Sequence, residues 1–252
     1  MKIIFLGTGT SDGVPMIGCK CNVCKSKDKR DKRTRASVLI QHKNKNYIID
    51  TSLDFREQML REKVDSLEAV FYTHHHADHS SGIVDLRSLN FIMHKHIDCY
   101  GNKDTMDVLE DKYDYIFNPI QIGGGIPDLE FHIIEKPMIF DDITVTPIPV
   151  KHGILNILGY RFNNFTYITD ASSISDESLK LIEGSEILVL NGLRYRPHST
   201  HLSLQESVNI ADTIKAKKTF FTHLTHDVLH KNLDKELPKN MYAAYDGLTL
   251  EI

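Results

Sequence analysis

The sequence predicts an α+β protein in which two packed β-sheets are covered by helices. Apolar, β-prone runs recur along the 252 residues, and each half of the chain shows several strands followed by helical segments. No low-complexity or Pro/Gly-rich hinge separates the halves. We therefore expect one domain over residues 1–252 that consists of two pseudo-symmetric halves.

The first half begins with an apolar strand at 2–6, which leads into an irregular stretch at 7–35 that is rich in Gly, Cys and charge. A polar turn at 43–46 joins two apolar runs and predicts a hairpin. The further elements expected in this half are strands at 36–41, 46–50, 67–72 and 97–100, helices at 53–63, 79–90 and 103–112, and a loop or lid at 113–127 inside an insertion at 87–130.

The second half repeats this pattern. The apolar runs predict buried strands, and the amphipathic segments between them predict helices. The elements expected here are strands at 130–135, 143–149, 156–162, 165–169, 187–190, 218–222 and 248–251, and helices at 175–183, 203–215 and 226–236.

The composition, 41% hydrophobic and 25% charged, is that of a soluble globular protein. A net charge of −4, from 30 basic and 34 acidic residues, is not typical of a dedicated nucleic-acid binder, and residues 87–130 are not notably basic. No apolar run is long enough to span a membrane or to form the core of a signal peptide. We therefore expect a cytoplasmic protein with no membrane partner and no extended nucleic-acid surface. The four cysteines then indicate metal ligands or free thiols rather than disulfides.

The segment 73–79 carries a dense set of metal-type side chains in the pattern H-x-H-x-D-H. It comprises His74, His76, Asp78 and His79 and directly follows the strand expected at 67–72. Because side chains alternate along an extended chain, His74 and His76 point to the same side. Histidine clusters also occur in solvated loops, but the strand context and the internal Asp favour a metal site for zinc, manganese or iron.

Three further ligand-type residues each follow the end of an apolar strand. They are His152, Asp170 and His223. Side chains at strand ends are held rigidly and remain accessible, so three such positions indicate a shared site. Asp50 also ends a strand, and it suits either of two roles: orienting a ligand histidine or capping the helix that follows.

With these residues the chain resembles the metallo-β-lactamase superfamily, whose signature is H-x-H-x-D-H followed by a distant His, Asp and His. The resemblance covers the chain from Gly7–Pro15 to His223 and implies an αββα sandwich with the site at one edge, between the halves. It further implies that His74, His76 and His152 bind one divalent metal, that Asp78, His79 and His223 bind a second, and that Asp170 bridges the two. A water bridging two such metals becomes a hydroxide nucleophile near neutral pH.

A non-ligand histidine before a helix assists the leaving group in the phosphodiesterase branch of this superfamily, which includes the tRNA 3′-processing nucleases. His201 matches that position, and His198 is the alternative. The expected catalytic residues are therefore His201 and Asp78. Arg194 and Arg196 suit phosphate contacts, although exposed arginines are common.

The triplet Cys19, Cys21 and Cys24 lies in a region without evident secondary structure. It needs a fourth ligand for tetrahedral zinc. The pattern is similar to the cyclic phosphodiesterase of the carbon–phosphorus lyase pathway, which pairs such a triplet with a histidine at the place of His226. We therefore expect one structural zinc that pins a loop at 13–35, with three free thiols as the alternative. Cys99 lies in an apolar strand and is expected to be buried.

Together these features predict a hydrolase that uses two catalytic metals, zinc or manganese or else iron, on a small or cyclic phosphodiester. The alternatives are a nuclease acting on RNA ends, a thioester or lactone hydrolase with the same metals, and a non-catalytic metal-binding domain. The sequence leaves the oligomeric state open, a homodimer included.

Overall fold

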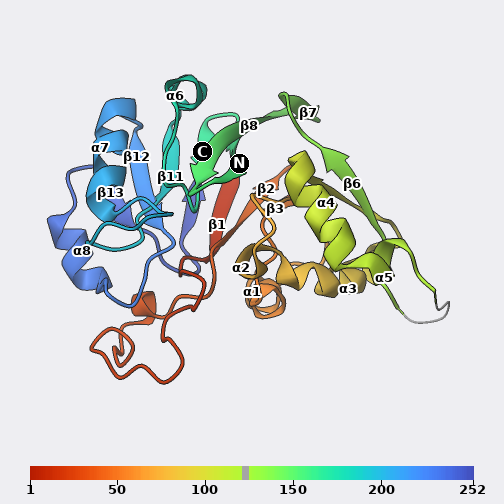
Figure 1. Cartoon of the computed structure of the whole chain (residues 1–252), viewed down its shortest axis with the longest axis horizontal. Coiled ribbons are helices and arrows are strands. Elements are labelled where there is room, and N and C mark those ends of the chain that lie inside the picture. The colour runs from red at the N-terminus through yellow and green to blue at the C-terminus, as the bar shows by residue number, and fades with distance from the viewer. Residues whose placement is uncertain (121–124) are drawn as a thin grey trace.

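Two seven-stranded β-sheets pack face to face in the computed structural model, which describes residues 1–120 and 125–252 (Figure 1). Helices cover the outer face of each sheet, so the layers run helix, sheet, sheet, helix. The expected αββα sandwich is therefore confirmed.

The first sheet has the strand order β14-β1-β2-β3-β4-β5-β6. Its strands are β1 (Lys2–Gly7), β2 (Ser37–His42), β3 (Lys45–Ile49), β4 (Ala69–Phe71), β5 (Ile97–Gly101), β6 (Leu129–Ile133) and β14 (Thr249–Glu251). The α-helices on its outer face are α1 (Phe55–Glu62), α2 (Ala77–Ser80), α3 (Leu86–Met93), α4 (Lys103–Lys112) and α5 (Asp114–Phe117). Short 3-10 turns occur at Lys29–Asp31 and Ser81–Asp85.

The second sheet has the order β13-β12-β11-β10-β9-β8-β7. Its strands are β7 (Met138–Phe140), β8 (Ile143–His152), β9 (Leu155–Phe162), β10 (Phe165–Tyr167), β11 (Ile187–Asn191), β12 (Lys218–Thr222) and β13 (Met241–Ala243). The helices on its outer face are α6 (Asp176–Ile182), α7 (Leu204–Ile214) and α8 (His230–Glu236).

One aromatic-rich core joins the two sheets. The ring of Phe71, on β4, lies 5.1–5.5 Å from the rings of four residues, and it is fully buried. Tyr100 lies on β5 of the first sheet. Phe140 lies on β7 of the second sheet, and Tyr160 and Phe162 lie on β9 of the same sheet. Because both halves contribute to this core, their relative position is set by side-chain packing.

The strand directions bring the functional ends together. Strands β3 and β4 are parallel neighbours, and so are β10, β11 and β12. The carboxyl ends of parallel strands meet at one edge of their sheet, which is where ligands bind in open α/β sheets. The residues that follow β3, β4, β10 and β12 therefore gather at one edge of the sandwich.

Four expectations for the elements differ from the structure. The single helix expected at 79–90 is divided into α2, the 3-10 turn at Ser81–Asp85 and α3. The expected loop at 113–127 contains α5, and its residues 121–124 lie outside the described residues. The strands β7 and β13 were not predicted, because each has only three residues and shows too little apolar alternation. The helix expected at 226–236 begins at His230, because Arg33 takes the carbonyls of Thr225 and Val228.

No helix of the described residues is long and apolar enough to cross a membrane.

Replacing Phe71 by Ala is expected to lower the free energy of unfolding by about 3–5 kcal/mol, because it opens a cavity in the core shared by both sheets. Chemical denaturation of the purified protein measures this change. Phe91→Ala is the matched control, since Phe91 is 78% exposed, and its effect is expected to stay within about 0.5 kcal/mol. Equal losses in the two variants would contradict the account of the core.

Candidate metal centre

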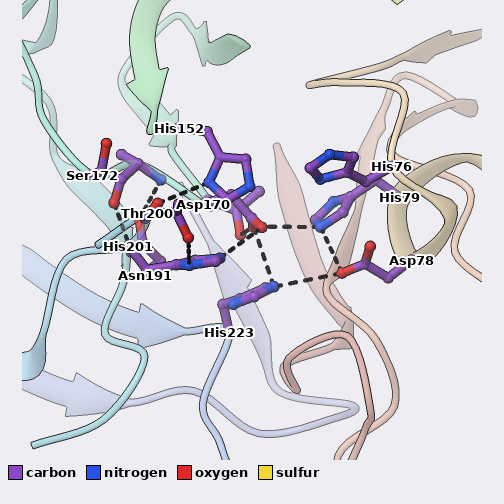
Figure 2. A network of polar contacts seen from close by, with 12 residues as sticks. His76, Asp78, His79, His152, Asp170, Ser172, Asn191, Thr200, His201 and His223 are labelled. Carbon is purple, nitrogen blue, oxygen red and sulfur yellow. Dashed lines mark hydrogen bonds and ion pairs between the residues drawn. The ribbon is translucent and has the colours of Figure 1, made fainter. Parts of the chain in front are cut away.

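The seven residues predicted as catalytic-metal ligands lie together at the edge between the two halves. In Figure 2, His76, Asp78 and His79 of the first half face His152, Asp170 and His223 of the second half. The potential ligand atoms form two groups, each with all its atoms within 4.8 Å of one another. One group is His74, His76 and His152, and the other is Asp78, His79, Asp170 and His223.

The local backbone at these strand ends is unusual. Asp50, Asp170 and His223 have φ values of 65°, 58° and 57°, in the left-handed region that residues other than glycine seldom adopt. Such conformations persist where the surroundings enforce them, and they cluster at functional sites. Each one turns the chain sharply just after β3, β10 or β12 and so directs a polar side chain to the shared edge.

In the first group, hydrogen bonds set which ring nitrogen faces the site. His152 donates from Nδ1 to the carbonyl of Thr200 at 2.8 Å, which leaves its Nε2 available as a ligand. The Nδ1 atom of His74 lies 3.0 Å from the hydroxyl of Thr73, and its Nε2 lies 3.0 Å from Nδ1 of His76. Burial lowers the pKa of His74 well below its usual value, and burial also lowers the pKa of His76. Neutral imidazoles of this kind are the form that binds a metal.

In the second group, the distances match those between ligands of one ion. His79 Nε2 lies 3.3 Å from a carboxylate oxygen of Asp78 and 3.3 Å from one of Asp170. His223 Nε2 lies 3.2 Å from the same oxygen of Asp170. Two ligand atoms bound tetrahedrally to zinc at the usual bond lengths lie about 3.4 Å apart.

The buried imidazoles of this group fit a cation for a second reason. The Nε2 atoms of His79 and His223 are buried and form no hydrogen bond of acceptable geometry within the described residues. Buried polar atoms normally have a partner, and each such exception calls for an explanation such as an ion. The donor set and these two atoms therefore fit a pair of divalent cations.

Electrostatics also favours positive charge here. Burial alone would lower the pKa of His79, but the carboxylates of Asp170, Asp78 and Asp50 outweigh burial and raise it well above its usual value. Burial would likewise raise the pKa of Asp170, yet the imidazoles of His223 and His79 hold it well below its usual range. Burial would also raise the pKa of Asp78, but His79 and His223 lower it below its usual range. Both carboxylates of the group are thus ionised and require a compensating cation.

Asp50 takes the first of its two expected roles. Its carboxylate lies 2.7 Å from Nδ1 of His79 and accepts hydrogen bonds from the amide and hydroxyl of Thr73, each at 2.8 Å. The residue at the N-cap of α1 is Asp54 instead. Asp50 therefore fixes the ring of His79 with Nε2 toward Asp78 and Asp170.

Asn191 is a site-forming residue that was not predicted. Its side chain pairs with both backbone groups of Ala171, accepting from the amide at 2.9 Å and donating to the carbonyl at 3.1 Å. The same carbonyl accepts from the amide of Leu202 at 2.7 Å. Asn191 thereby holds the turns that carry Asp170 and His201 side by side (Figure 2). In the sequence, the only indication of this role is a polar amide side chain directly after the apolar run 187–190.

His201 reaches the centre, whereas His198, Arg194 and Arg196 do not contact the ligand groups. His201 Nε2 lies 3.1 Å from Asp170, and His201 can also group with His152 and Asp170. His198 is exposed, and its Nδ1 lies 3.3 Å from Nδ1 of His201. Arg196 pairs with Asp227 at 3.3 Å, and Arg194 donates to the carbonyl of Pro197 at 3.4 Å.

The structure also brings Cys19, Cys21, Cys24 and His226 together, with one ligand atom of each within 4.8 Å of the others. His226 Nδ1 lies 3.3 Å from Sγ of Cys19 and 3.5 Å from Sγ of Cys21. The backbone amide of Cys24 donates to Cys21 and is the main cause that lowers the pKa of the Cys21 thiol to about 6. A thiolate favoured at neutral pH, with two thiols and an imidazole around it, suits tetrahedral zinc. The fourth cysteine, Cys99, is buried in the core.

Known proteins similar to this chain have diverse names. An octanoyltransferase of Porphyromonas gingivalis is 38% identical over 255 residues, which cover 98% of this chain and 51% of that protein. An exodeoxyribonuclease WalJ of Streptococcus pneumoniae is 25% identical over 60% of this chain and 55% of its own length. A ribonuclease Z of Listeria monocytogenes is 27% identical over 64% of this chain and 48% of its own length. The chain thus spans about half the length of these relatives.

Among solved structures, a diphosphatase of the PhnP family superposes with a TM-score of 0.93 at 42% sequence identity, over 100% of this chain and 97% of that one. The short form of human tRNase Z superposes with a TM-score of 0.71, over 100% of this chain and 99% of that one. At 16% identity the second likeness concerns the fold alone.

Asp50→Asn is expected to weaken metal binding at the centre by about 10–100-fold, because the amide no longer offers His79 a carboxylate partner while its shape is kept. Competition with a chelator of known affinity, followed by metal analysis, measures the change. Asp142→Asn removes an exposed carboxylate as a control. Equal affinities in Asp50→Asn and the unmodified protein would refute the orienting role.

Cys21→Ser is expected to remove one zinc per chain and to lower the melting temperature, because the loop at 13–35 loses the ion that cross-links it. Metal analysis and thermal unfolding report the two effects. Cys99→Ala, which removes a thiol from the core, is expected to keep the full zinc content. Retention of all zinc by Cys21→Ser would exclude the structural site.

The model of the β-lactamase superfamily domain matches residues 45–224, which include every residue of the two ligand groups described above. The match covers well over half of the chain, and the layered fold and the strand-end site agree with it. This chain therefore belongs to the β-lactamase superfamily and has the metallo-β-lactamase fold.

Proposed function

We propose that this chain is a phosphodiesterase that depends on two divalent cations. The observation that carries the proposal is the place of His201: its Nε2 lies 3.1 Å from Asp170, the residue that joins the two ligand groups. A histidine outside both ligand groups, yet directly beside them, suits proton transfer to a leaving group.

The two ligand groups would each hold one cation, with Asp170 between them. His74, His76 and His152 would hold one, and Asp78, His79 and His223 the other. When bound, such a pair lowers the pKa of water and neutralises charge on phosphoryl oxygens. Zinc or manganese fits this set of imidazoles and carboxylates, and iron is a further alternative.

The chain's own residues orient the ligand histidines and protonate the leaving group. Asp50 holds His79, and the carbonyl of Thr200 holds His152, so both rings are in place before substrate binds. His201 Nδ1 lies 2.9 Å from the hydroxyl of Thr200, which steadies its ring with Nε2 toward Asp170. As the bond between phosphorus and the leaving oxygen breaks, the imidazolium form of His201 gives the proton on Nε2 to that oxygen and becomes a neutral imidazole.

The names of several relatives support this reaction class. A diphosphatase, a ribonuclease and an exodeoxyribonuclease all cleave bonds at phosphorus. Within the class, a small or cyclic phosphodiester was expected from the sequence, with the end of an RNA as the alternative.

A second candidate is the hydrolysis of thioesters or lactones by the same cations. The observation in its favour is the 38% identity to a protein named octanoyltransferase, because that name denotes acyl transfer. The matching region is 51% of that protein, and the name belongs to the whole of it.

A panel of substrates tests the two candidates. Metal-loaded protein is assayed on bis(p-nitrophenyl) phosphate, a ribose cyclic phosphate, an octanoyl thioester and a lactone, with chelator-treated protein as the control. We expect turnover of the phosphodiesters. Turnover of the thioester or lactone alone would overturn the proposal in favour of the second candidate.

His201→Ala is expected to lower kcat for a phosphodiester by roughly 10²–10⁴, the usual effect of losing a general acid. An activated leaving group such as p-nitrophenolate needs less help, so a substrate with an alkoxide leaving group is expected to show the larger loss. His94→Ala, which changes an exposed histidine that belongs to neither ligand group, is the control. A loss within about threefold for His201→Ala would remove its acid role, and a larger loss in His198→Ala would transfer the role to that residue.

A further inference from the structure

The charge of this chain is distributed unevenly. The segment 13–35, called the cysteine loop below, contains eight basic and two acidic residues, whereas the remainder of the chain contains 22 basic and 32 acidic residues. The net charge of −4 therefore conceals a strongly basic loop on an acidic body. Figure 1 shows this loop, in red, projecting beside α8.

Half of the basic residues in the loop form ion pairs or hydrogen bonds within the protein. Arg33 is buried, pairs with Asp31 at 3.3 Å, and donates to the carbonyls of Thr225 and Val228 at 3.0 and 2.9 Å. Three others are also engaged: Arg30 with Asp28, Lys32 with the carbonyl of Cys24, and Arg35 with Asp54.

The other half consists of four exposed lysines. They are Lys20, Lys25, Lys27 and Lys29, and none of them forms an ion pair with the described residues. Four of the eight basic residues of the loop make contacts within the protein, so the four exposed lysines remain as uncompensated positive charge. Ammonium groups on flexible stems bind phosphates as point charges, without the fixed geometry that arginine requires.

The loop is held close to the metal centre. Cys19 and Cys21 contact His226, which lies only three residues after His223, and three residues span at most about 11 Å. Leu224, next to His223, exchanges backbone hydrogen bonds with Thr8 and Thr10 at the start of the irregular stretch. The backbone that carries the exposed lysines is thus anchored to the segment that supplies the ligand His223.

We propose that the cysteine loop binds the phosphate backbone of a single-stranded nucleic acid whose terminal phosphodiester lies in the metal centre. This inference rests on the proposed function and names its substrate class. Four charges spread over ten residues exceed what one phosphate needs, whereas a nucleic-acid strand presents phosphates in succession. The substrate would then be an oligonucleotide end rather than a small cyclic phosphate.

A charge-matched pair of variants tests the proposal. In the loop variant, Lys20, Lys25, Lys27 and Lys29 are all replaced by Gln. In the control variant, four exposed lysines elsewhere, Lys2, Lys136, Lys180 and Lys239, are replaced by Gln. Both variants lose the same charge, and equal melting temperatures show that neither is misfolded.

Binding of a fluorescein-labelled single-stranded RNA and of the matching DNA is measured by anisotropy over a range of salt concentrations, and bis(p-nitrophenyl) phosphate turnover is measured in parallel. We expect the loop variant to bind at least about tenfold more weakly and to lose roughly 0.7 of log–log salt slope per lysine, with the control variant near the unmodified protein. The RNA and DNA arms show which strand is preferred. Turnover of bis(p-nitrophenyl) phosphate is expected to stay unchanged in both variants.

Equal nucleic-acid affinity in the loop and control variants would overturn the inference, as would binding of the loop to anionic phospholipid vesicles without binding to either strand. These outcomes are separable from failure of the proposed function. That failure would appear as no phosphodiester turnover by the unmodified protein, whereas loss of the inference alone leaves bis(p-nitrophenyl) phosphate turnover intact.

Discussion

The structure depends on concentrated negative charge at the seam between its two halves. Asp50, Asp78 and Asp170 are all at most 9% exposed and surround His79, which is fully buried. Burying ionised carboxylates is costly unless they are paired with positive charge. Without a cation, a proton on His79 supplies part of that charge, which is why the pKa of His79 rises. The Nε2 atoms of His79 and His223 face these carboxylates and form no hydrogen bond with the described residues. A bound cation would replace the proton on Nε2 of His79 and supply the positive charge in its place.

This arrangement requires the whole fold. Asp78 and His79 come from the first half, whereas Asp170 and His223 come from the second, so the second ligand group exists only when the halves are docked. The core around Phe71 fixes that docking, and the left-handed turns at Asp170 and His223 direct the side chains to the seam. Stability and site geometry are therefore coupled through the packing of the two sheets.

Much of the site could be predicted because its residues follow apolar strands. His152, Asp170 and His223 each end a run that is readable from the sequence, and the structure brings all three to His74–His79. The role of Asn191 could not be predicted in this way, because Asn191 at the end of β11 pairs with Ala171, which is 20 residues away in the sequence. Whether Asp50 orients a ligand histidine or caps a helix depended likewise on the position of His79 in the fold. The delayed start of α8 depends on Arg33, which is distant in sequence.

The charge of the cysteine loop shows a different limit. The expectation of a small substrate came from the net charge and from residues 87–130, whereas the positive charge lies in 13–35. To interpret this positive charge, one must know which basic residues form contacts within the protein and that the loop lies beside the metal centre. Composition averages over such local differences.

The most direct measurement is anomalous diffraction from crystals of the protein grown with zinc or manganese, recorded at the absorption edge of each metal. The account predicts two peaks about 3.5–4 Å apart on either side of the Asp170 carboxylate, the separation of two-metal sites. A single peak, or none, between His74 and His223 would contradict the dinuclear centre.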